Sequence, residues 1–324
     1  MIAGHDHGVE QFRRAWDLRA VHHAWLLAGP RGVGKAHFAR TAALRILAEA
    51  AGPAFDDEGL GAPGDHRIAK LLDAGSHPDM RWLQRLPKEK AEGLARNITV
   101  KQVRELGEFL NLTPALSDWR AVVIDTVDDL EREGANALLK MLEEPPSNTI
   151  VFLVSHAPGR LLPTIRSRCR RLDLRKLDDD AMTSVLERQL PEASAAERQR
   201  LIDIAGGSVG RALATAALDL APLEAKALQI LKDGDPYNER RVALADELAK
   251  KGAADRYRAF LDLLPSLLVH QARSLPVQQR ERALFAYERV RELTAVAPRL
   301  SLDPAATVFQ LGGILASVAP LRVS

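Results

Sequence analysis

An apolar run, a glycine-rich turn and a helix-forming segment follow one another directly near the start of the chain, and this succession limits the fold more than any other feature. Residues 24–28 (AWLLA) are apolar and are followed by Gly-Pro, which is typical of a buried strand. Residues 32–51 (GVGKAHFARTAALRILAEAA) are rich in residues that favour a helix. Strand, loop and helix in this order predict the first unit of an α/β fold.

Later segments have the same strand-like composition. They are residues 80–86 (MRWLQRL), 120–125 (RAVVID), 149–155 (TIVFLVS) and 170–174 (RRLDL). The segments between them carry apolar residues at helical spacing, and Pro145 stops one of these helices. Alternating strands and helices predict βαβ units, and therefore a parallel sheet with helices on both faces.

The domain organisation follows from the place where the strand signals stop. Residues 1–175 predict the α/β domain, residues 176–217 a small helical domain, and residues 218–324 a further helical domain. The last of these contains about five segments with an apolar face at the helical period.

Composition excludes several classes of protein. Lys plus Arg number 45 and Asp plus Glu 43, a net charge of +2, so any contact with nucleic acid must be local. Cys169 is the single cysteine, which rules out an internal disulfide and indicates a reducing compartment. The first residues lack a secretory signal pattern, and the apolar segment 305–321 is shorter than the ~20 residues of a membrane span. We therefore expect a cytoplasmic protein that does not enter a membrane.

A candidate phosphate-binding loop links the first strand to its helix. Residues 29–35 (GPRGVGK) match the pattern G-x-x-x-x-G-K, in which glycines let backbone N–H groups surround phosphate oxygens and the lysine reaches the outer phosphates. The alternative is a glycine-rich turn without a ligand. The predicted nucleotide-binding residues are Gly29, Gly32, Gly34 and Lys35, together with Asp125 at the end of a predicted strand.

Two departures weaken this nucleotide site. Ala36 occupies the position of the Ser or Thr whose hydroxyl ligates magnesium, and a methyl group cannot replace it. Thr126 follows Asp125 where many such enzymes have a glutamate that activates water. We therefore expect weak ATP binding or none, negligible hydrolysis, and no bound metal.

Residues 134–172 (GANALLKMLEEPPSNTIVFLVSHAPGRLLPTIRSRCRRL) carry a resemblance to a known family. They resemble the clamp-loader branch of the AAA+ family, and the similarity extends over residues 1 to about 215. The resemblance implies an AAA+ parallel-sheet domain, a small helical lid domain and a carboxy-terminal all-α collar domain. It also implies that Arg168, in the Ser-Arg-Cys triplet, is an arginine finger inserted into the ATP site of a neighbouring subunit. The alternative for Arg168 is a solvated surface arginine within a basic run.

Two further expectations come from the same resemblance. Arg211 falls where the family has a second sensor arginine on the lid, although a role in helix packing or domain docking is an open alternative. Many relatives carry a cysteine-ligated zinc ion after the loop helix, whereas residues 41–80 contain no cysteine, so no zinc is expected.

The predicted function is that of an assembly component. The resemblance implies a non-hydrolysing subunit of a hetero-oligomeric ring that activates a neighbouring ATPase through Arg168 and helps to load a sliding clamp on primer-template DNA. Such a chain would be neither a polymerase nor an active ATPase. Two hypotheses stay open beside it: a catalytically competent AAA+ motor subunit, and a monomeric regulator that uses the fold only to bind proteins.

Overall fold

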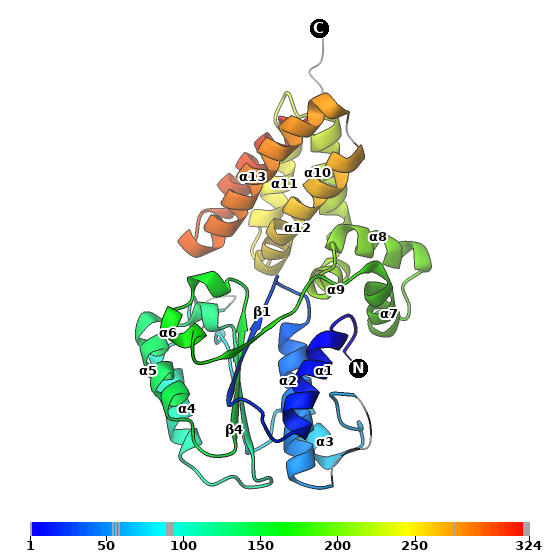
Figure 1. Ribbon diagram of the computed structural model, residues 1–324. Helices are drawn as coiled ribbons and strands as arrows, with labels where there is room; N and C mark the ends of the chain where they lie inside the picture. Colours follow the sequence, from blue (N-terminus) through cyan, green and yellow to red (C-terminus); the bar gives the residue numbers. More distant parts are fainter. Residues whose placement is uncertain are drawn as a thin grey trace. The chain divides into compact units, whose positions relative to one another are not determined.

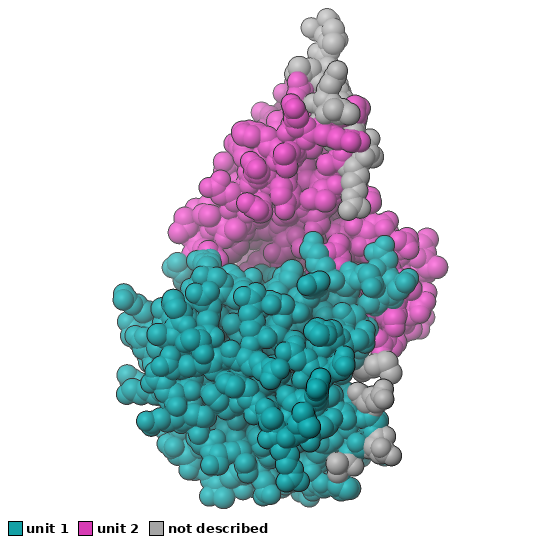
Figure 2. Space-filling model, viewed as in Figure 1, with its two compact units in different colours: residues 1–88, 94–181 teal, residues 89–93, 182–324 magenta. Residues whose placement is uncertain are grey.

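The structure is a computed structural model that describes residues 2–53, 55, 57, 59–88, 94–274 and 276–319. It consists of two compact units, which Figure 1 draws as a ribbon and Figure 2 distinguishes by colour. The first unit contains the described residues up to 181, and the second those from 182 onward. The predicted boundaries at residues 175 and 217 stay predictions.

The first unit is built on one parallel sheet of five strands. The strands are β1 (Ala24–Ala28), β2 (Met80–Leu83), β3 (Arg120–Asp125), β4 (Thr149–Ser155) and β5 (Arg170–Asp173). Their order in the sheet is β2-β3-β4-β1-β5, so that β1 is paired on both sides. Its five residues are all buried, which explains why the sequence of β1 is continuously apolar rather than alternating.

Helices cover both faces of this sheet (Figure 1). They are α1 (Asp6–Asp17), α2 (Lys35–Ala50), α3 (Arg67–Asp73), α4 (Val100–Leu110), α5 (Arg132–Glu143) and α6 (Pro163–Arg166), with short 3-10 turns η1 (Val127–Asp129) and η2 (Pro158–Arg160). Helices α4, α5 and α6 share a core with one face of the sheet, which includes Leu26 and Leu153. On the other face Phe12 of α1 contacts Trp25 and Phe152 with ring centroids 5.0 and 5.6 Å apart.

The second unit is helical throughout its described residues. Helix α7 (Asp179–Gln189) leads into α8 (Ala195–Ala205), α9 (Val209–Ala217), α10 (Ala221–Asp233), α11 (Glu239–Ala249), α12 (Ala254–Ser274), α13 (Val277–Leu300) and α14 (Pro304–Ala316). The helices from α10 onward share one apolar core and match the helices expected over residues 218–324. The predicted fold class, a parallel-sheet α/β domain followed by helices alone, is confirmed.

A pair of glycines on α14 lets this helix approach α11 closely. A Cβ atom on Gly312 would lie 2.7 Å from the Cβ of Arg241, whereas a Cβ on Gly313 would meet only the Nη1 end of the same side chain, at 2.9 Å. Arg241 is also bound by Asp235, with Nε 3.2 Å from a carboxylate oxygen. The backbone of α11 therefore needs a residue without a side chain at position 312.

We predict that Gly312→Ala lowers the free energy of unfolding by about 1–3 kcal/mol, because the added methyl group must push apart two packed helices. Gly313→Ala is the matched control: a flexible guanidinium can move aside, and alanine gains up to about 1 kcal/mol of helix propensity. Urea denaturation of both variants measures the difference. Equal stability of the two variants would contradict this account of the helix contact.

Candidate functional site

The candidate site lies where three neighbouring parallel strands end. In the sheet register Ala28 of β1 is opposite Ser155 of β4, and Asp125 of β3 is opposite Val154. The loop that follows β1 therefore lies beside the carboxyl ends of β3 and β4. This edge is where open α/β sheets bind ligands, and the structure brings Lys35 and Asp125 together there as the sequence predicted.

The fold itself requires glycine in this loop, apart from any need to bind a ligand. Gly29 has a φ of 149°, and a Cβ on it would lie 2.0 Å from the carbonyl oxygen of Leu174, in the segment that leaves β5. Gly32 and Gly34 also have positive φ values, of 77° and 100°. Glycine is thus required at the first position to let the chain pass behind the loop, whether or not a phosphate is bound.

Lys35 turns back onto its own loop. Its Nζ atom donates hydrogen bonds to the carbonyl oxygens of Gly29, at 2.8 Å, and Pro30, at 2.5 Å, and its side chain is almost completely buried. Burial lowers the pKa of Lys35 to about 8, although the carboxylates of Asp125 and Asp128 oppose this effect. The ammonium group that would meet phosphates therefore has partners within the chain.

Acidic side chains at the same edge also interact with groups of the chain itself. Asp128 in η1 accepts a hydrogen bond from Ser155 Oγ at 2.9 Å and one from the backbone N–H of His156 at 2.5 Å. Burial raises the pKa of Asp125, and the positive charge of Lys35 opposes this rise. Ser155 thus donates its hydroxyl hydrogen bond to a carboxylate and not to the ring of His156.

A histidine near the amino terminus covers the loop. His5 precedes α1, is buried, and donates a hydrogen bond from Nε2 to the carbonyl oxygen of Val33 at 2.7 Å. Burial lowers the pKa of His5, so its neutral form is favoured. Sequence reasoning missed this contact, since His5 and Val33 lie far apart in the chain and nothing in the local pattern joins them.

Arg168 lies away from this loop, on the face of the sheet that α5 covers. Its Nη2 atom is 2.8 Å from a carboxylate oxygen of Glu143 at the end of α5, and Nη1 donates to the carbonyl oxygen of Thr164 at 3.0 Å. The side chain is 35% exposed. Cys169, next to it, packs against the core shared with α5, and burial raises the pKa of its thiol to about 12. The triplet is thus a fixed turn with a partly exposed guanidinium.

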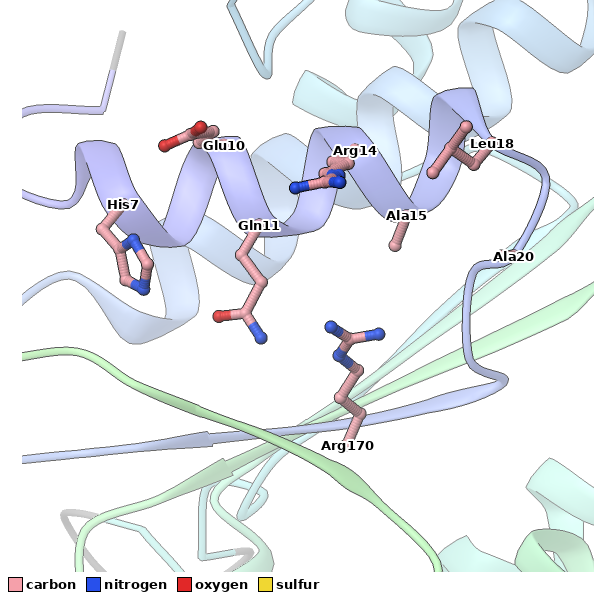
Figure 3. Close-up of a pocket in the computed structure, with 8 residues that line it drawn as sticks. All are labelled: His7, Glu10, Gln11, Arg14, Ala15, Leu18, Ala20 and Arg170. Atoms are coloured by element: carbon pink, nitrogen blue, oxygen red, sulfur yellow. The ribbon is translucent and has the colours of Figure 1, made fainter.

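The neighbouring arginines differ from Arg168. The guanidinium of Arg170 lies over the Trp25 ring, 5.2 Å from its centroid, and faces a shallow hollow beside α1 in which Gln11 and Arg14 also lie (Figure 3). Arg171 pairs with Asp173 at 2.7 Å. The basic run is therefore not uniformly solvated, and among these three residues only Arg168 is bound to α5.

Arg211 lies in the second unit at the start of α9. Its Nη1 atom donates to the carbonyl oxygen of Ala205 at 3.1 Å and to Ser266 Oγ in α12, and burial lowers its pKa. Arg211 therefore ties α9 to the end of α8 and to α12. These contacts support the helix-packing alternative, and its role as a nucleotide sensor stays a prediction.

Within the described residues no group of three or more His, Cys, Asp and Glu side chains could hold a metal ion. No helix formed by the same residues has the length and apolar character needed to cross a bilayer. The residues of the loop edge can position an anion through N–H groups and an ammonium group. Ala36 offers no hydroxyl to a metal ion, and Thr126 offers no carboxylate to activate water.

The part of the chain that holds these residues is similar to known proteins. The family model described as DNA polymerase III, delta subunit, matches residues 4–178, more than half of the chain. The chain belongs to the DNA polymerase III delta subunit family. The match contains the candidate loop, Glu143 and Arg168. It ends before α7, so the helices α7–α14 are described from their own contacts alone.

Individual relatives agree with this assignment. The delta' subunit of DNA polymerase III from Pseudomonas aeruginosa is 39% identical over 191 residues, which are 59% of this chain and 55% of that protein. The gamma/tau subunit from Mycobacterium tuberculosis is 32% identical over 196 residues, 58% of this chain and 30% of that protein. The chain thus spans about half the length of the first relative and less than a third of the second. The resemblance to clamp-loader proteins that the sequence suggested is confirmed, and a delta' subunit is among these relatives.

One solved structure covers nearly the whole chain. It is a DNA polymerase III gamma subunit-related protein from Thermotoga maritima, with 15% sequence identity and a TM-score of 0.48, over 94% of this chain and 98% of that one.

We predict that His156 makes stability depend on pH. Burial, and secondly the positive charge of Lys35, lower its pKa from 6.5 to about 4, and its Nδ1 atom has no hydrogen-bond partner among the described residues. The folded state therefore binds fewer protons than the unfolded state between these values. The free energy of unfolding should fall as pH drops from about 6.5 toward 4, by about 1–3 kcal/mol from this residue.

Urea denaturation of wild type and His156→Gln at several pH values measures this effect, since glutamine keeps the backbone N–H bond to Asp128. The variant should lose part of the pH dependence below 6.5. His7→Gln, at an exposed position, is the control. Parallel pH profiles of wild type and His156→Gln would show that His156 is not the group responsible.

Proposed function

We propose that this chain is a clamp-loader subunit that does not hydrolyse ATP itself and donates Arg168 in trans to the ATP site of a neighbouring subunit. In this role it helps to load a sliding clamp on primer-template DNA. Similarity to delta' and gamma/tau subunits supports a hetero-oligomeric ring with gamma/tau-type ATPases and a delta subunit as partners. The chain's own loop binds ATP weakly or not at all.

The position of Arg168 is the observation that carries this proposal. Arg170 is in register with Trp25, three residues before the end of β1, so the triplet lies roughly 10 Å along the strands from the start of the loop. Arg168 is bound to α5, whereas α1 packs on the opposite face of the sheet and is preceded by His5, which covers the loop. A guanidinium held there lies apart from the chain's own loop, and its side chain is 35% exposed, so a neighbouring subunit could reach it.

The state of the loop supports the non-hydrolysing part. The ammonium group of Lys35 is bonded to the carbonyl oxygens of Gly29 and Pro30, so a nucleotide would have to displace these bonds. Ala36 offers no oxygen to magnesium, and Thr126 offers no carboxylate to water. Arginine, by contrast, suits the stabilisation of charge on a transferred phosphoryl group because its planar fork contacts two oxygens at once.

A competent ATPase motor subunit is the second candidate. It is favoured by the 32% identity to a gamma/tau subunit over 196 residues. Nucleotide binding to the isolated chain, measured by calorimetry with and without magnesium, separates the two. Binding that magnesium strengthens, with turnover abolished in Lys35→Ala, would establish the motor and refute the proposal.

We predict that Arg168→Ala abolishes most of the turnover at one ATP site of a reconstituted clamp loader, a loss of about 10³-fold at that site, because an arginine finger stabilises the transition state. The assay is clamp- and DNA-stimulated ATP hydrolysis by gamma/tau, delta and this chain. Exposed Arg166→Ala is the matched control, and Lys35→Ala should leave the rate unchanged. Wild-type activity of the Arg168→Ala complex would overturn the proposal.

A further inference from the structure

Glu143 and Arg168 form a pair that joins two elements of the first unit. Glu143 is the last residue of α5, and Arg168 lies in the turn between α6 and β5. The Nη2 atom of Arg168 is 2.8 Å from Oε1 of Glu143. Thr164 holds the same guanidinium through its carbonyl oxygen at 3.0 Å. A guanidinium group has more N–H donors than these two contacts use, so an anion can bind it without displacing them.

We infer that Glu143 is a positioning residue that fixes the orientation of Arg168 before the neighbouring ATP site is met. This inference rests on the proposed function, because it assigns a role in the same transfer of an arginine to a partner. Arginine has many rotamers, and a group that must contact a phosphoryl oxygen gains from being held in one of them. Glu143 and Thr164 together select that rotamer.

Both ends of the pair are anchored to one core. Leu142, which precedes Glu143, is buried in the core beneath α5, and its carbonyl oxygen accepts a hydrogen bond from His23 at 3.1 Å. On the other side Ile165 is buried in the same core, and Cys169 packs against it. The distance between the two backbones is therefore set by apolar packing, and the ion pair adds only the direction of the guanidinium.

The position of Glu143 in α5 also supports a positioning role. It lies at the carboxyl end of the helix, where the helix dipole disfavours a negative charge. A local rule broken in this manner is expected at functional sites and calls for a compensating contact, which Arg168 supplies. Pro145 stands two residues later and cannot continue the helix, so Glu143 is at the carboxyl end of α5.

The Glu143–Arg168 ion pair is weak enough to orient the guanidinium without preventing it from binding a phosphate. Glu143 is 47% and Arg168 35% exposed, and an ion pair this accessible to water is weak. It can therefore favour one rotamer without competing strongly with the several negative charges of a nucleotide. Glutamine at position 143 would keep a hydrogen-bond acceptor for Nη2 and remove the charge, which separates orientation from electrostatics.

The test uses the reconstituted clamp loader with Glu143→Ala, Glu143→Gln and, as a matched control, the adjacent Glu144→Ala. Glu144 is exposed, and the described part of the chain contains no ion pair that involves it. We expect Glu143→Ala to lower the kcat of stimulated ATP hydrolysis by about threefold to fivefold with little change in KM, because the finger is less often in its productive orientation. Glu143→Gln should restore most of the rate, and Glu144→Ala all of it.

A double variant separates this inference from the proposed function. If Glu143 acts only through Arg168, Glu143→Ala combined with Arg168→Ala is no slower than Arg168→Ala alone. Additive losses, or wild-type kcat in Glu143→Ala beside an inactive Arg168→Ala site, would overturn the positioning role and leave the finger intact. No effect of Arg168→Ala would refute the finger itself. Assembly of each variant, followed by gel filtration, checks that a lost rate is not a lost subunit.

Discussion

The pairing of β1 with both β4 and β5 is the constraint on which the functional arrangement depends. Because the three strands are parallel, the loop after β1 lies beside the ends of β3 and β4, while the turn before β5 lies near the beginning of β1. This register places the glycine-rich loop at the carboxyl ends of the strands and Arg168 near their amino ends. The close passage of Leu174 behind Gly29 fixes the same loop from behind.

Several charged and polar side chains at the loop edge are hydrogen-bonded to neutral groups of the chain. Lys35 is bonded to loop carbonyl oxygens, Asp128 to Ser155 and the His156 backbone, and His5 to Val33. Buried polar groups are costly unless they are paired, and this pairing lets the loop keep its form without a nucleotide. It explains why a loop with the glycines and lysine of a nucleotide site can persist in a chain that lacks the hydroxyl for magnesium.

The sequence predicted the strands, most of the helices and the place of Lys35 and Asp125, because hydrophobic periodicity and glycine spacing are local signals. Helix α4 shows this well: its apolar residues at helical spacing, Val103, Leu106, Phe109 and Leu110, are all buried. The contacts of Glu143, His5 and Asp128 were not predictable. Each depends on two segments far apart in sequence that only tertiary packing brings together. Arg211 could be placed on a helix, but its bond to Ser266 could not.

The central claim is that this chain gives a catalytic arginine to another subunit and does not use its own loop for hydrolysis. The most direct measurement is an experimental structure of the chain in complex with gamma/tau and delta subunits, a non-hydrolysable ATP analogue and magnesium. The account predicts the Arg168 guanidinium within hydrogen-bond distance of the terminal phosphate bound to a neighbouring subunit. A nucleotide and metal ordered beside Lys35, with Arg168 remote from every subunit boundary, would contradict it.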